Sequence, residues 1–128
     1  MSKTVLDASA LLALLNQEAG AQKLTLEVLR EAISSTVNLA EVQTKLVREG
    51  GDPEEAWGLA LAPISEAAPF TSEQAKLAGA LAKQTQPLGL SLGDRACLAL
   101  AMTLKAPVYT TDRSWKKLKL GIRVHVMR

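Results

Sequence analysis

Short apolar runs alternate with longer helical stretches along the chain. Clusters of β-branched and apolar residues predict strands near residues 4–6, 32–35, 68–70, 107–110 and 122–126. Apolar residues at helical spacing predict helices at 9–16, 19–30, 37–49, from 53 onward, at 72–84 and at 91–105, and a helical turn at 114–118. Such alternation is typical of a parallel sheet covered on both faces. The pattern therefore predicts an α/β fold whose central parallel β-sheet of four or five short strands is flanked by helices.

Local signals place several of the helix boundaries. Asp52 followed by Pro53 is a favourable N-cap and first helical position. Ser91 precedes the most apolar helix, and Asp94 lies three residues further on, as in a capping box. The pair Gly50-Gly51 ends the preceding helix.

Composition limits the kinds of site that the chain can build. A length of 128 residues, 48% of them hydrophobic and 22% charged, predicts one globular domain spanning residues 1–128. A single cysteine excludes an internal disulfide and a cysteine-rich zinc site, and a single histidine excludes two-histidine metal motifs. The chain starts without a usable signal peptide and has no apolar run long enough to span a membrane, so we expect a cytoplasmic setting.

Charge is divided unevenly along the chain. Residues 112–128 carry six basic side chains and one acidic side chain, whereas residues 1–111 carry nine basic and twelve acidic side chains. A basic tail on an acidic body points mildly to a polyanionic partner, and a solvated, charged C-terminus is the simpler explanation of this feature taken alone. Arg113, Lys116 and Lys117 of this tail, together with Arg95, are candidates for binding substrate phosphates.

Four acidic residues are predicted to gather at one edge of the sheet. Asp7 and Asp112 directly follow predicted strands, and Glu41 and Asp94 lie near the starts of helices. In parallel α/β sheets, ligands bind outside the carboxyl ends of the strands. Taken singly, each acid has a structural explanation: Asp7, Asp94 and Asp112 can cap helices or turns, and Glu41 can be an exposed helix residue.

Converged carboxylates need a counterion. Two unit charges about 4 Å apart repel by about 4 kcal/mol at an effective dielectric constant near 20. An all-oxygen ligand set suits Mg²⁺ or Mn²⁺ rather than Zn²⁺. A hard divalent cation in an acidic cleft is typical of phosphoryl chemistry.

The sequence around these acids resembles the PIN domain family, and most closely its small VapC-type ribonuclease toxins of toxin–antitoxin systems. The similarity covers nearly the whole chain and lies in four blocks that occur in the family's order and spacing. The blocks are Val5–Leu14, Asn38–Val42, Leu92–Ala101 and Val108–Trp115.

This resemblance implies a single-domain PIN-like fold and a metal-dependent endoribonuclease that leaves a 5′-phosphate and a 3′-hydroxyl. Asp7, Glu41, Asp94 and Asp112 match the family's four acidic positions, as ligands of Mg²⁺ or Mn²⁺. Two hydroxyl residues, Ser9 and Thr110, match positions that accompany the first and last acids. The chain departs from some relatives at Ser114, where they carry a further acid, and at Trp115, where phenylalanine is usual.

The resemblance also implies an RNA substrate and a cognate antitoxin protein as partners. Leu11, Leu12, Leu14 and Leu15 exceed the single apolar stripe that a surface helix needs. They predict a hydrophobic groove for an antitoxin helix, a homodimer interface, or a helix buried between layers.

Two other functions remain open from the sequence. A catalytically weak PIN-fold module could use the same cleft and tail to hold RNA. A receiver-like signalling domain has a similar length and an acidic Mg²⁺ pocket, but it requires an acidic pair near the first strand and a phosphorylatable aspartate after the third. Neither is present.

Overall fold

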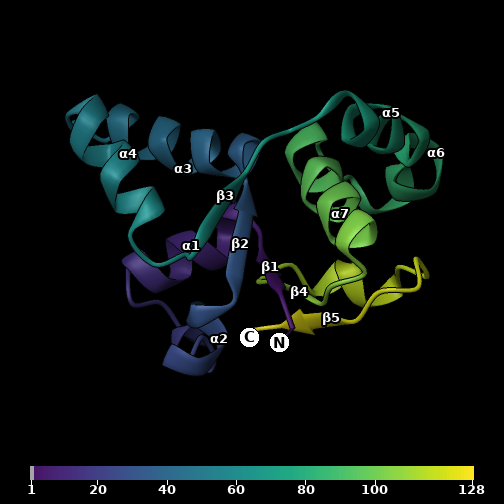
Figure 1. The fold of residues 1–128 in the computed structure, drawn as a ribbon, viewed down its shortest axis with the longest axis horizontal. Helices are drawn as coiled ribbons and strands as arrows, with labels where there is room; N and C mark the ends of the chain where they lie inside the picture. The colour runs from purple at the N-terminus through teal and green to yellow at the C-terminus, as the bar shows by residue number, and fades with distance from the viewer. Residues whose placement is uncertain (1) are drawn as a thin grey trace.

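A fully parallel five-stranded sheet forms the centre of the molecule (Figure 1). The computed structural model describes residues 2–128. The strands run in the order β3-β2-β1-β4-β5, so β1 lies in the middle of the sheet. Their bounds are β1 Thr4–Leu6, β2 Ala32–Ser35, β3 Glu66–Ala68, β4 Val108–Thr110 and β5 Val124–Val126. The α/β fold with a central parallel sheet is confirmed.

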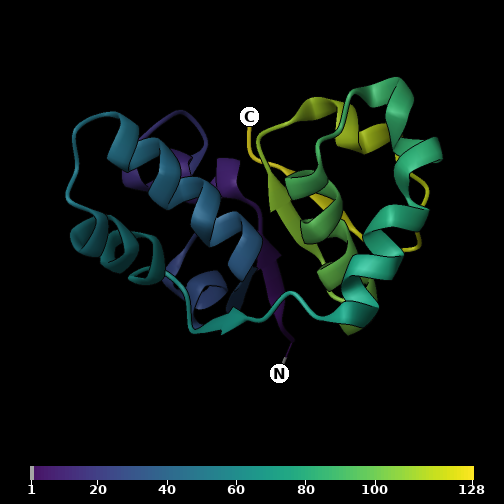
Figure 2. The same ribbon diagram turned by 90° about the horizontal axis from the view of Figure 1, so that it is seen from above.

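Helices cover both faces of this sheet. Figure 2 shows α1, α3 and α4 on one side and α5, α6 and α7 on the other. The α-helices are α1 Ala8–Leu15, α2 Leu26–Arg30, α3 Thr36–Arg48, α4 Pro53–Leu61, α5 Ser72–Ala80, α6 Ala82–Thr85 and α7 Leu92–Leu104. Three short 3₁₀ helices are η1 Ala21–Lys23, η2 Gln86–Leu88 and η3 Arg113–Lys117.

The middle strand contributes to a separate core on each face. Val5 packs with residues of α7 and η3, whereas its neighbour Leu6 packs with residues of α1 and α3. Both are fully buried, as expected where successive side chains of a covered strand point to opposite faces. Trp115 of η3 closes the first core and is also fully buried. Position 115 therefore anchors the backbone that directly follows Asp112.

The prediction of a single helix over residues 19–30 is wrong. Gly20 adopts a left-handed conformation (φ 92°), and the chain then makes only the η1 turn. Thr25 starts α2 anew, because its hydroxyl accepts a hydrogen bond from the Val28 amide. A threonine cap and a left-handed glycine thus divide a segment that had the apolar spacing of one helix.

Two other boundaries differ from the prediction. The strand expected at 68–70 lies earlier, at Glu66–Ala68, because Pro69 has no amide hydrogen to extend the ladder. The helix expected at 72–84 divides into α5 and α6 at Leu81. The caps predicted at Asp52 and Ser91 are confirmed, and Asp94 completes a capping box with Ser91.

No helix among residues 2–128 is both long enough and apolar enough to cross a membrane.

Trp115 provides a test of the packing beneath the candidate site. We expect Trp115→Ala to lower the free energy of unfolding by about 3–5 kcal/mol, because it leaves a large cavity in the core. Trp115→Phe should cost less, since it keeps a ring there and removes a buried indole N–H that has no partner among residues 2–128. Chemical denaturation measures both, and equal losses would contradict this packing.

Candidate functional site

Asp7 is a buried carboxylate at the end of the central strand. Its side chain is 3% exposed and caps α1, accepting a hydrogen bond of 2.7 Å from the Ala10 amide. The hydroxyls of Ser9 and Thr110 donate to its two oxygens, at 2.7 and 2.6 Å. Burial raises the pKa of Asp7 to about 6, although these hydrogen bonds oppose the rise. The structure therefore brings Asp7, Ser9 and Thr110 together.

The two hydroxyls also join the ends of β1 and β4. Ser9 Oγ lies 3.3 Å from Thr110 Oγ1 and accepts a hydrogen bond of 3.0 Å from the Thr111 amide. Thr110 Oγ1 accepts one of 3.1 Å from the Asp112 amide. The backbone leading to Asp112 is thus held by the same hydroxyls that contact Asp7.

Glu41 reaches the same region from α3. Asn38, one turn earlier on this helix, donates from Nδ2 to Glu41 Oε1 at 2.7 Å and to the Gly93 carbonyl at 3.0 Å. Burial, and to a lesser degree the charge of Asp94, raises the pKa of Glu41. Sequence reasoning missed Asn38 and Gly93 as site residues. The three-residue spacing of Asn38 and Glu41 on a helix was the available signal for Asn38.

Asp94 lies at the start of α7 and uses one oxygen to cap it. Its Oδ2 accepts a hydrogen bond of 2.9 Å from the Ser91 amide. Its charge also contributes to the raised pKa values of Asp7 and Glu41. Burial raises the pKa of the Cys97 thiol, and the charges of these three carboxylates add to that effect. Asp7, Glu41 and Asp94 are therefore grouped around the first turns of α7, beside a cysteine that belongs to the core.

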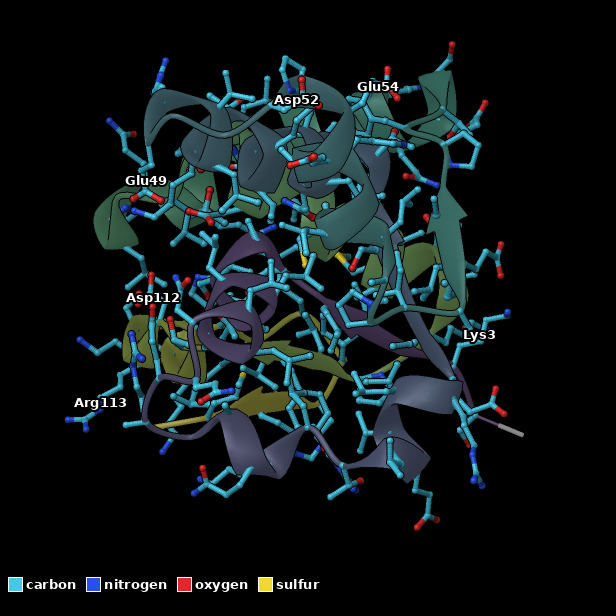
Figure 3. The ribbon with its side chains drawn as sticks, turned by 90° about the vertical axis from the view of Figure 1, so that its left-hand side faces the viewer. Lys3, Glu49, Asp52, Glu54, Asp112 and Arg113 are labelled. Atoms are coloured by element: carbon cyan, nitrogen blue, oxygen red, sulfur yellow. The ribbon has the colours of Figure 1, made fainter. Side chains whose placement is uncertain are left out.

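Asp112 stands at the rim of this group. Figure 3 shows it at the molecular edge opposite Lys3, which precedes β1. Its Oδ1 accepts hydrogen bonds from the amide and hydroxyl of Ser114, at 2.9 and 2.7 Å, and so caps η3. Within residues 2–128, no three acidic, histidine or cysteine side chains stand close enough together to hold a metal ion in their present positions.

Three of the four acids retain an oxygen for another ligand. Glu41, Asp94 and Asp112 each accept hydrogen bonds at one carboxylate oxygen, while the other oxygen accepts none from residues 2–128. Asp7 differs, because both of its oxygens accept hydrogen bonds. These four acids therefore offer a cation oxygen ligands only, and one of them, Asp7, is buried.

The candidate phosphate-binding residues are spread over several surfaces. Arg95 donates to the Ala78 carbonyl of α5 at 3.0 Å, and Arg113 donates to the Arg128 carbonyl at 3.0 Å. Lys116 and Lys117 are exposed on η3, shortly after Asp112. The two lysines are therefore open to solvent, whereas each arginine is engaged with a backbone carbonyl.

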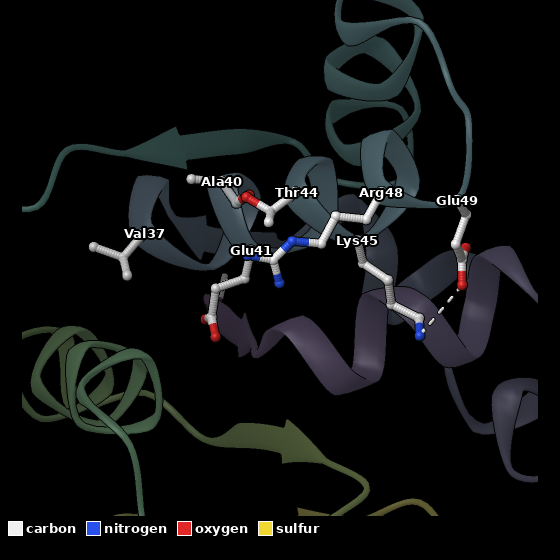
Figure 4. A pocket seen from close by; sticks show the side chains of 7 residues that line it. All are labelled: Val37, Ala40, Glu41, Thr44, Lys45, Arg48 and Glu49. Carbon is white, nitrogen blue, oxygen red and sulfur yellow. Dashed lines mark hydrogen bonds and ion pairs between the residues drawn. The ribbon is translucent and has the colours of Figure 1, made fainter.

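An open cavity of about 780 Å³ lies along α3, lined by residues from Val37 to Glu49, with Glu41 among them. Figure 4 shows the Arg48 and Lys45 side chains on the same stretch of helix as Glu41 and Thr44. Sequence reasoning missed this surface, although residues 41, 44, 45 and 48 have the spacing of one helical face.

The leucines of the first helix serve mainly the core. Leu11 is fully buried, and Leu12, Leu14 and Leu15 are partly buried against the cluster below α1. The reading of α1 as a helix packed between layers accounts for most of its apolar surplus. The homodimer and the antitoxin groove at this helix stay predictions.

Comparisons with known proteins point to one fold. The Klebsiella pneumoniae toxin–antitoxin complex contains a chain 17% identical to this one, with a TM-score of 0.75 and 98% of each chain covered. A Rickettsia felis VapBC2 chain, solved bound to a promoter DNA fragment, is 16% identical, with a TM-score of 0.76 and 98% of each chain covered. Mycobacterium tuberculosis VapC20, described as a sarcin–ricin loop cleaving toxin, is 19% identical, with a TM-score of 0.75. The match covers 90% of this chain and 94% of the VapC20 chain.

Curated proteins give no significant sequence match. The family model of the PIN domain, however, matches residues 4–120, which include all four acids and both hydroxyl residues. The chain therefore belongs to the PIN domain family.

Proposed function

We propose that this protein is a divalent-metal-dependent endoribonuclease, the VapC-type toxin of a toxin–antitoxin pair. The observation that carries the proposal is the buried Asp7 carboxylate, held by two hydroxyls and grouped with Glu41 and Asp94 at the carboxyl edge of the sheet. Membership of the PIN domain family and the likeness to toxin structures support it.

The donor set fits a hard divalent cation. Its potential ligands are carboxylates only, and Asp7 carries a charge that burial disfavours unless a cation offsets it. Glu41, Asp94 and Asp112 would hold Mg²⁺ or Mn²⁺ through their free oxygens, together with Asp7. When bound, such an ion supplies charge neutralisation at the phosphate and a more acidic water.

The chain's own residues prepare the site for this role. Ser9 and Thr110 fix both oxygens of Asp7 and so orient a group that is otherwise costly to bury. Asn38 orients Glu41 in the same way from α3. Lys116 and Lys117 on η3, with Arg113 beside Asp112, are suited to hold phosphates of a bound RNA strand. Arg95 serves this role only after leaving the Ala78 carbonyl.

An antitoxin protein is the proposed partner that keeps the enzyme inactive. The Klebsiella pneumoniae, Rickettsia felis and Salmonella typhimurium neighbours were each solved with an antitoxin partner. The half-buried leucines of α1 are the surface that we propose for an apolar antitoxin segment or a second copy of this chain.

A catalytically weak RNA-binding module is the alternative, and cleavage itself separates the two. We expect Asp94→Asn to lower RNA cleavage by more than about a hundredfold, because it removes one charge from the cation site. The fold should persist, since an asparagine oxygen can still accept from the Ser91 amide. Divalent-dependent cleavage on a labelled RNA, with circular dichroism as the folding control, measures this. Full activity in the variant, or in the parent protein with EDTA, would exclude the mechanism.

Asp7 should make the metal-free protein less stable as pH rises. The pKa of Asp7 is about 6 in the folded protein and near 3.8 in the unfolded chain. Between about pH 4 and pH 6, the folded state therefore binds a proton at Asp7 that the unfolded state has lost. The stabilisation is complete below about pH 4 and is lost as pH rises through about 6, a change of about 3 kcal/mol. Denaturation of Asp7→Asn should therefore show a flatter pH dependence than the parent, and higher stability at pH 7.5. Glu54→Gln on α4 controls for net charge, and a parent that is insensitive to pH 4–7 contradicts the assignment.

The lysines of η3 should govern the salt dependence of RNA binding. Replacing Lys116 and Lys117 by alanine removes two phosphate contacts, so the slope of log K against log salt should fall by about 1.4 for a single strand. Affinity should drop about equally for different sequences. Lys76→Ala with Lys83→Ala, on α5 and α6, is the matched control. An unchanged slope would mean that the η3 lysines are merely solvated.

A further inference from the structure

The close approach of Glu41 to α7 depends on the absence of a side chain at position 93. A Cβ on Gly93 would overlap Glu41 Oε1 and would lie 2.6 Å from Cδ and Oε2. Glu41 therefore occupies the space that any other residue at 93 would fill. Glycine disfavours a helix relative to alanine, and Gly93 has no left-handed conformation that would require it. The requirement at this position is for space.

A single buried amide fixes Glu41 in that space. Asn38 is 1% exposed. Its Nδ2 donates to the Glu41 carboxylate and to the Gly93 carbonyl, and both of these groups act as acceptors here. Flipping the amide would turn its oxygen toward these two acceptors, so the chemistry sets its orientation. The cost is a buried Asn38 Oδ1 that accepts no hydrogen bond within residues 2–128.

Glu41 has a competing partner on its own helix. Lys45 lies four residues later, and a glutamate four residues before a lysine is the favourable orientation for a helical ion pair. In the structure, Lys45 instead contacts Glu49 at 3.4 Å, and both side chains are about half exposed. Figure 4 shows the Glu41 carboxylate and the Lys45 ammonium leading away from each other. The structure thus gives Glu41 a hydrogen bond from Asn38 and leaves Lys45 to Glu49.

We propose that Asn38 and Gly93 form a clamp that keeps the Glu41 carboxylate at the start of α7, where it completes the cation site. This Glu41 clamp rests on the proposed function and adds two positioning residues to it. Gly93 supplies the room, and Asn38 supplies the hydrogen bond. An asparagine with an orphaned oxygen is a poor choice for packing alone, but it suits a carboxylate that must be held.

Mn²⁺ binding, followed by isothermal titration calorimetry at pH 7.5, tests the clamp without relying on cleavage. Gly93→Ala should weaken Mn²⁺ binding about 10- to 100-fold, the range found when groups supporting a metal ligand are removed. Gly58→Ala and Gly79→Ala are matched controls, because a Cβ at either helical glycine meets nothing within 4 Å. In a Glu41→Ala background, Gly93→Ala should have no further effect. An equal loss in both backgrounds would overturn the proposal.

Asn38→Leu separates positioning from folding. The substitution is close to isosteric, and the loss of the orphaned oxygen offsets the loss of the two Nδ2 hydrogen bonds, so the melting temperature should change little while Mn²⁺ affinity falls about tenfold. Adding Lys45→Ala should restore part of that affinity, because it removes the competing partner of Glu41. A lower melting temperature with unchanged Mn²⁺ affinity would show that Asn38 only links the two helices, and would overturn the clamp.

The outcomes distinguish this inference from the function on which it rests. A parent protein whose Mn²⁺ affinity falls in Gly93→Ala and Asn38→Leu, but which cleaves no RNA, retains the clamp and loses the proposed function. A parent that cleaves RNA, with Mn²⁺ affinity indifferent to Gly93→Ala and Asn38→Leu, retains the function and loses the clamp. A parent that binds no Mn²⁺ overturns the clamp.

Discussion

The structure depends on keeping the carboxylate of Asp7 buried at the end of the central strand. Burial disfavours its charge, and this is offset by two hydroxyl donors and by the Ala10 amide in the first turn of α1. These donors come from α1 and β4, and Asp7 itself directly follows β1, so satisfying one carboxylate also fixes the start of a helix and joins two strand ends. Among the remaining acids, the charge of Asp94 adds to this electrostatic cost at both Asp7 and Glu41.

Three of these acids therefore have a structural role beside the chemical role that we propose for them. Asp7 caps α1, Asp94 completes a capping box, and Asp112 caps η3. At Asp94 and Asp112 one oxygen caps while the other is available, which explains how a helix-capping residue can also be a ligand. The structural explanation of each acid does not compete with the functional one.

The sequence was informative where local chemistry decides the structure. The strands at 4–6 and 32–35, the caps at Asp52 and Ser91 and the four acidic positions follow from hydrophobic spacing, cap chemistry and the resemblance to a family. It was uninformative where a distant contact decides. Gly93 reads as an ordinary glycine until α3 is known to pass beside it, and Asn38 reads as a helix residue until its two acceptors are placed. The division of residues 19–30 was missed because apolar spacing outweighed the cap at Thr25.

The central claim is that these carboxylates form one cation site, and anomalous diffraction from crystals soaked in Mn²⁺ tests it most directly. Our account predicts one strong peak bounded by oxygens of Asp7, Glu41 and Asp94, with Asp112 at its rim. It also predicts that the peak is lost in Asp94→Asn crystals soaked in the same way. A peak elsewhere on the molecule, or none beside Asp7 in the parent protein, would contradict the account.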